Sequence, residues 1–176
     1  MINIKRLISF LVCCVVLVGC GYTVKSALPD TYKSIYVEPF KNSINFTSES
    51  DRRIYIPLLE VKIRDAIVNR FLFDGNLKVT DKYNSDLILS GELTSYNRSV
   101  LRYTDDEEAE EYRVTITVSL RLRDARTGKL VWEEPSFSGE ADYFVSGAFA
   151  ESEDSAIDNA VVDLARRIVE RTIENW

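Results

Sequence analysis

The chain has 176 residues, with 22 basic and 28 acidic side chains, a formal net charge of −6 and no histidine. The missing imidazole excludes Ser-His-Asp triads, histidine general bases and histidine-containing zinc sites. Because the chain has no basic excess, we expect no nucleic-acid partner.

The first twenty residues have the layout of a secretory signal that ends in a lipidation site. Lys5 and Arg6 precede an uncharged stretch over 7–19, which is shorter than the roughly 20 apolar residues of a membrane-spanning helix. The stretch ends in Leu17-Val18-Gly19-Cys20, which matches the bacterial lipobox. We predict a signal peptide over 1–19 and a lipid on the Cys20 thiol. The alternative is an ordinary signal peptide followed by an accidental cysteine.

Removal of the signal leaves a mature chain, 20–176, of a length that suits one domain. Cys13 and Cys14 leave with the signal, so no disulfide framework is possible. The loss of two basic residues changes the net charge from −6 to −8. Residue 21 is Gly rather than Asp, which favours the outer membrane over the inner one. We predict a lipidated tether over 20–33 and a single domain over 34–176.

The first half of the domain predicts a strand, a helix and a second strand. Residues 34–40 alternate up to Pro39 and indicate a strand, followed by a polar loop over 41–53. Pro57 suits the first turn of a helix, and apolar residues at helical spacing continue to about Phe73. The turn sequence Asp74-Gly75-Asn76 ends this helix, and 77–80 is a short strand candidate.

The middle of the chain predicts two strands joined by an acidic tip. Residues 86–96 form a strand that loses its apolar pattern beyond Ser95. Six acids lie in the run 105–111, and like charges at this density favour a solvated hairpin tip. Residues 112–123 alternate apolar and polar at every position, so one face of this strand is buried and the other is wet.

The last part predicts a return strand and a second helix. Residues 124–129 form a tight turn, and the strand over 130–144 is interrupted at Pro135, as an edge position or a bulge. A helix over 151–176 has Ser152 as its N-cap. The element order indicates an α+β fold, a two-layer sandwich with two helices packed on one face of a mainly antiparallel sheet.

Several short motifs follow one another along the mature chain: Cys20-Gly21-Tyr22, Leu28-Pro29, Ile35 to Asn42, Asp86 to Gly91, the strand over 112–122, Asp124 to Trp132, and a closing helix from about Ala156. As an ordered set they resemble the lipopolysaccharide-assembly lipoprotein family, LptE. The resemblance covers essentially the whole mature chain. It implies an outer-membrane lipoprotein that is held in the inner leaflet by its lipid, faces the periplasm and sits in the lumen of the LptD β-barrel. There it assists barrel assembly and lipopolysaccharide delivery.

The wet face of the strand over 112–123 carries the candidate binding residues. Arg113, Arg121 and Arg123 share this face, Lys129 lies just past the following turn, and we expect Arg98 and Arg102 to approach it. Arginine forks bind phosphate in bidentate fashion, which suits the phosphorylated sugars of lipid A. The resemblance implies basic residues on this sheet that contact lipopolysaccharide. The alternative is a solvated sheet face.

Other functions find less support in the residues. The acidic run lacks the Asp/Asn spacing and the Gly of a calcium loop, so we expect no metal and no cofactor. The alternative to the family's role is an envelope lipoprotein that binds another partner, either as a peptidoglycan synthase activator or as a secretion-barrel component. A cell-wall hydrolase is the third possibility. Because no pair of acids is placed in an apolar cleft, we assign no catalytic residue.

Overall fold

The computed structural model describes residues 31–44 and 56–174. The predicted signal peptide, Cys20 and most of the predicted tether lie outside these residues. Along the chain the described elements are β1 (Ser34–Val37), β2 (Lys41–Asn42), α2 (Leu59–Asp74), β3 (Lys78–Val79), β4 (Leu87–Tyr103), β5 (Ala109–Asp124), β6 (Leu130–Phe144) and α3 (Glu153–Glu174).

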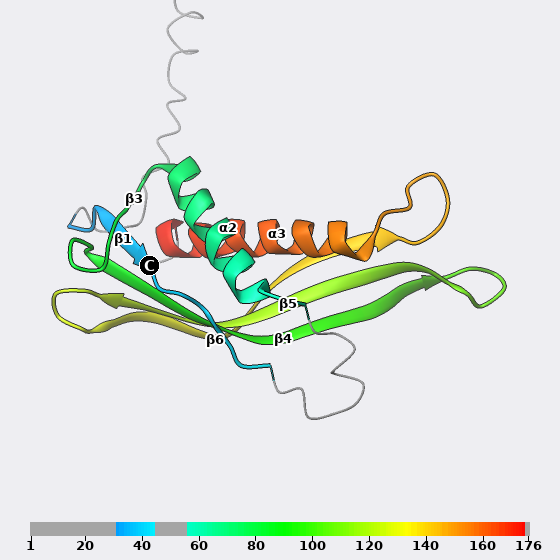
Figure 1. Cartoon of the computed structure of the whole chain (residues 1–176), viewed down its shortest axis with the longest axis horizontal. Helices are drawn as coiled ribbons and strands as arrows, with labels where there is room; N and C mark the ends of the chain where they lie inside the picture. Colours follow the sequence, from blue (N-terminus) through cyan, green and yellow to red (C-terminus); the bar gives the residue numbers. More distant parts are fainter. Residues whose placement is uncertain (1–30, 45–55, 175–176) are drawn as a thin grey trace, which may run out of the picture.

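The strands form one mixed sheet, and both helices lie on the same face of it (Figure 1). The strand order is β3-β1-β4-β5-β6, with β2 beside β4. The long strands β4, β5 and β6 form an antiparallel meander, whereas β1 pairs in parallel with β3 and β4. The predicted two-layer α+β fold with a mainly antiparallel sheet is therefore confirmed.

The period of two in β5 divides the sheet into a helix-covered face and an open face. Its even-numbered residues from Val114 to Leu122 are fully buried under the helices, and its odd-numbered residues remain partly or fully exposed on the open face. The predicted alternation is confirmed for this strand. Burying these apolar side chains is the main favourable contribution to the stability of the sheet.

Helix α3 contacts the sheet unusually closely at one glycine. A Cβ added to Gly139 of β6 would lie 2.5 Å from the Leu164 Cβ and 2.6 Å from its backbone, so only glycine fits there. The predicted N-cap is confirmed, because the Ser155 backbone N–H donates to Ser152 Oγ at 3.2 Å. Within the described residues, no helix has both the length and the apolar character needed to cross a membrane.

Helix α2 begins two residues later than Pro57 suggests. Leu58 precedes it in the left-handed region, at φ 60°, so Pro57 lies outside the first turn. The predicted end is confirmed at Gly75, which has φ 77° and donates its N–H to the Phe71 carbonyl at 3.0 Å. Positive φ costs glycine little, which explains the stop at this position.

Strand β4 is longer than its hydrophobic pattern predicts. It continues through Tyr103, with an irregularity between Leu93 and Ser95 that shifts the register against β5. Strand β2 was not predicted at all: Lys41 and Asn42 pair with Glu92 and Leu93 of β4, where the sequence indicates a loop. A two-residue strand has too few positions to produce a recognisable alternation.

The β4–β5 hairpin extends beyond the helices and ends in the acidic tip (Figure 1). Residues 105–108 are exposed, as predicted, and the Thr104 N–H donates to the Glu108 carbonyl at 2.8 Å. The end of the acidic run differs from a solvated tip. Glu110 and Glu111 already belong to β5, and Glu111 forms a 3.3 Å ion pair with Arg102 of β4.

Candidate binding face

Arg113 lies on the open face, as predicted, but acidic residues of the neighbouring strand neutralise it. Its Nε and one terminal nitrogen donate to the two carboxylate oxygens of Asp142 at 2.7 and 2.8 Å, and Glu140 lies 3.3 Å away. These hydrogen bonds raise the pKa of Arg113 and hold the pKa of Asp142 below its usual range. A ligand phosphate would have to compete with two carboxylates for this guanidinium.

Arg121 is paired across the same two strands, whereas Arg123 is not. The Arg121 Nε donates to Glu133 Oε1 at 2.6 Å, and this hydrogen bond raises the pKa of Arg121. Arg123 is exposed and forms no ion pair with the described residues. Arg123 is therefore the cation of this strand whose charge is least compensated.

A shallow hollow of about 220 Å³ connects Arg121 and Arg123 to the edge of the sheet. Lys41 of β2 lines it too, and Lys41 was not among the residues predicted from the sequence. Hydroxyl groups and carboxylates complete the wall. The lining residues are Glu38, Pro39, Lys41, Ser90, Gly91, Glu92, Ser119, Arg121 and Arg123. We refer to this region as the open-face hollow.

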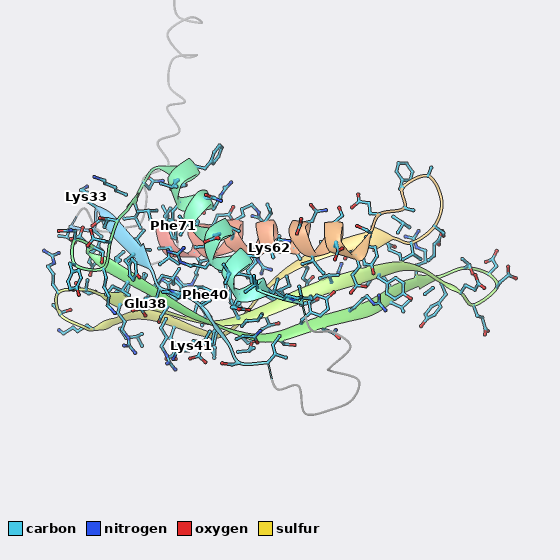
Figure 2. All side chains as sticks on the ribbon, viewed as in Figure 1. Lys33, Glu38, Phe40, Lys41, Lys62 and Phe71 are labelled. Atoms are coloured by element: carbon cyan, nitrogen blue, oxygen red, sulfur yellow. The ribbon has the colours of Figure 1, made fainter. Side chains whose placement is uncertain are left out.

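The packing of Phe40 explains how Lys41 reaches the open-face hollow. Phe40 is 7 % exposed and belongs to the core under the helices. Its ring lies directly against Gly91, where a Cβ would be 2.3 Å from two ring carbons. Adjacent residues of an extended chain point to opposite faces, so a buried Phe40 directs Lys41 outward. Figure 2 shows Phe40 pointing inward and Lys41 pointing to the other side of the sheet.

Charges around the open-face hollow are almost balanced. Lys41 Nζ lies 3.9 Å from Glu92, and Glu38 forms a 2.8 Å ion pair with Lys82. With Arg121 paired to Glu133, one positive charge, that of Arg123, is left over. A single uncompensated guanidinium beside hydroxyl groups can donate hydrogen bonds to one phosphate, because the paired charges around it repel the phosphate little.

The predicted basic residues do not form one cluster. Arg113 and Arg121 are eight residues apart on β5, which corresponds to about 27 Å along a strand. Lys129 is exposed in the β5–β6 turn and does not line the open-face hollow. Only Arg121 and Arg123 of the predicted set are brought together there.

Arg98 and Arg102 diverge because β4 is irregular twice between the start of the strand and Arg102: first between Leu93 and Ser95, before Arg98, and again between Val100 and Arg102. The first irregularity moves Arg98 to the helix-covered side, where its guanidinium lies 4.8 Å from the centre of the Tyr112 ring and pairs with Glu153 of α3. Arg102 remains near the open face, opposite Glu111 and over the Phe144 ring. The expectation that both approach the wet face is therefore wrong for Arg98.

The two faces of the sheet therefore differ. The helices cover one face and close the core, and the open face carries paired charges around a hollow. This arrangement defines a two-layer α+β domain with one uncovered sheet face. The family model described as lipopolysaccharide-assembly, LptE, matches residues 32–172. The match covers most of the chain, so the chain belongs to this family of non-enzymatic lipoproteins of the bacterial envelope.

Solved structures share the fold at low sequence identity. The protein XCC0632 from Xanthomonas campestris is 14% identical, with a TM-score of 0.54 over 83% of this chain and 86% of that one. The hypothetical protein CT253 from Chlamydia trachomatis is 13% identical, with a TM-score of 0.53 over 80% and 95%. No curated protein matches the sequence.

Proposed function

We propose that the chain is the lipoprotein subunit of a lipopolysaccharide export translocon in the outer membrane. It is anchored in the inner leaflet through Cys20, and it assists the assembly of an LptD-type β-barrel and plugs its lumen. The observation that carries this proposal is the family match over residues 32–172. Family membership itself indicates a role in lipopolysaccharide assembly. Our proposal adds the partner barrel, the leaflet that holds the lipid and the position of the domain in the barrel lumen.

The elongated shape of the domain supports a plug that enters a lumen from one end. The chain enters the fold at β1, at one end of the sheet, whereas the β4–β5 hairpin extends past the helices at the other (Figure 1). A lipid at Cys20 would hold the first end close to the membrane surface. The hairpin is then the part that reaches furthest into the barrel.

Recovery of the barrel tests this proposal directly. The full-length lipidated chain, tagged at its C-terminus, is extracted in mild detergent, captured, and its partners are identified by mass spectrometry. We expect LptD in amounts comparable to the tagged chain. Capture of a peptidoglycan synthase or of a secretion barrel instead of LptD would overturn the assignment.

Within this function, we propose that the open-face hollow binds a phosphate of lipopolysaccharide. Arg123 is the primary ligand, and Arg121 and Lys41 assist it from either side. Two features support this: Arg123 has no acidic partner among the described residues, and the hydroxyl groups of Ser90 and Ser119 line the same hollow. We keep Lys129 and Arg113 as separate predictions for further contacts with lipopolysaccharide. Lys129 lies beyond the hollow, and Arg113 is about 27 Å from Arg121 along the strand.

A charge-matched pair of variants tests the hollow. Lys41→Gln combined with Arg123→Gln removes two charges inside it, and Lys78→Gln combined with Arg126→Gln removes two exposed charges outside it. We expect only the first pair to weaken lipopolysaccharide binding, roughly tenfold for a loss of 1.4 kcal/mol. The difference should shrink as salt is raised, because the contact is ionic. If both double variants bind lipopolysaccharide equally well, the open-face hollow is not the binding site and the open face is a solvated surface.

A further inference from the structure

The C-terminal end of α2 exposes two adjacent apolar side chains. Leu72 is 62% exposed and Phe73 is 82% exposed, while Phe71 beside them is fully buried. Phe73 also forms one wall of an apolar hollow of about 350 Å³ between α2 and α3, together with Ala66, Val162 and Ala165. Adjacent exposed apolar residues beside an apolar hollow are a typical feature of an interaction surface.

A cation lies within this apolar surface. The Arg70 guanidinium is 5.5 Å from the centre of the Phe73 ring and lines the same hollow. Its Nε is enclosed and has no hydrogen-bond partner among the described residues. An apolar surface that carries a guanidinium matches the chemistry of a phospholipid, whose phosphate lies directly above its acyl chains.

The surface lies close to the point where the chain enters the fold. Lys78, five residues after Phe73, pairs with Ser34 at the start of β1, and its N–H donates to the Lys33 carbonyl at 2.9 Å. Five residues span at most about 17 Å. Asp86 fixes the entry point by accepting hydrogen bonds from the backbone of Lys33 and Ser34 at 2.9 and 3.1 Å. Lys33 and Lys78 are both exposed and add positive charge to this end.

The length of the preceding chain limits how far this end can lie from a lipid anchor. Residues 20–30 connect Cys20 to the described domain, and eleven residues span at most about 40 Å when fully extended. A leaflet that holds an acyl chain at Cys20 is therefore within reach of the whole end of the domain. Basic residues there are attracted to anionic headgroups.

We propose that the end of α2 is a membrane-contact site, at which Leu72 and Phe73 insert into the phospholipid leaflet that holds the Cys20 lipid and Arg70 binds a headgroup phosphate. This rests on the proposed lipidation of Cys20. The site gives the domain a second attachment to the leaflet, which fixes its orientation. One acyl anchor alone leaves a domain free to tumble, whereas two attachments restrict it.

An equally exposed aromatic side chain at the opposite end provides the matched control. Phe149 is 81% exposed in the loop between β6 and α3, at the same end as the acidic tip (Figure 1). Glu151 lies two residues after it, and the Val145 N–H of this loop donates to the Glu110 carbonyl at 3.0 Å, which holds the loop beside the acidic end of β5. An anionic leaflet repels acidic surroundings of this kind, so Phe149 should not insert.

The experiment uses the mature chain, 20–176, and does not depend on cellular lipidation. Cys20 is its only cysteine, so it can be coupled to a maleimide-phospholipid in vesicles of phosphatidylethanolamine and phosphatidylglycerol that contain brominated acyl chains. Phe73→Trp and Phe149→Trp are compared with the parent chain. We expect the tryptophan at 73 to lose emission to bromine quenching and to shift to the blue, and the tryptophan at 149 to remain unquenched.

Other outcomes overturn the inference. Equal quenching of both tryptophans, or none at position 73, would exclude a specific insertion of this end. If position 73 is unquenched but Leu72→Ser combined with Phe73→Ser reduces LptD recovery, the surface contacts protein rather than lipid. Fatty-acid labelling of the full-length chain in cells tests the anchor separately, so its failure is distinguishable from failure of the membrane contact.

Discussion

Replacing Gly91 by alanine should displace the Phe40 ring and lower the free energy of unfolding by about 2 kcal/mol. The new Cβ would lie 2.3 Å from two ring carbons and 2.7 Å from a third. Because carbon atoms pack at about 3.5–4.0 Å, the ring must retreat by at least about 1 Å. Phe40 is only 7% exposed, so its retreat returns apolar area to water. Complete exposure of a phenylalanine costs about 1.5–3 kcal/mol, which sets the expected range.

A double-mutant cycle in urea isolates this contact. Phe40→Ala alone should cost about 3–5 kcal/mol, as for other buried aromatics. In that background Gly91→Ala should cost nothing, or stabilise by about 0.5–1 kcal/mol, because alanine loses less chain entropy in a strand. The coupling between the two sites is then about 2 kcal/mol or more. Additive costs for the two substitutions would refute the idea that the Phe40 ring is what requires glycine at position 91.

Three further predictions test the anchor, the strand faces and the entry point of the chain. Cys20→Ser should abolish incorporation of labelled fatty acid in cells, and label retained by the variant would contradict the lipobox assignment. Val118→Asp buries an unpaired charge and should cost several kcal/mol, whereas Thr117→Asp on the open face should change the urea midpoint little; equal midpoints would mean that the faces are reversed. Hydrogen bonds from the Lys33 backbone and, to a smaller extent, from the Ser34 side chain hold the pKa of Asp86 below its usual value. The stabilisation by Asp86 should therefore be complete above about pH 5 and decline as pH falls further, so Asp86→Ala should lose less stability than wild type on acidification; parallel acid profiles would contradict this.

Much of the fold follows from patterns that extend over many residues. The alternation of β5 predicts its buried face residue by residue, and the turn at Gly128 and the helix stop at Gly75 follow from the freedom of glycine at positive φ. Pro135 is confirmed both as an edge position and as an irregularity, since the register shifts between Phe137 and Glu134 on β6. These signals are local, so one sequence is sufficient to read them.

The arrangement of the binding face depends on register, which the sequence does not display. The pairing of Arg113 with Asp142 and of Arg121 with Glu133 requires knowing which residues of β5 and β6 lie opposite each other. One extra residue near Ser95 reverses the inward and outward positions that follow, and this places Arg98 on the helix-covered side, where it is exposed beside Glu153 of α3. Lys41 was missed because its position depends on the long-range packing of Phe40 against Gly91.

Strand β6 forms one edge of the sheet, and its irregularity has a consequence for solubility. An exposed edge strand offers unpaired N–H and C=O groups on which a second chain can extend the sheet. Pro135 removes one such donor in the middle of β6, and the bulge beside it bends the edge away from a flat template. The β6 edge therefore resists pairing with the same edge of a second copy, although no other strand of the described sheet covers it.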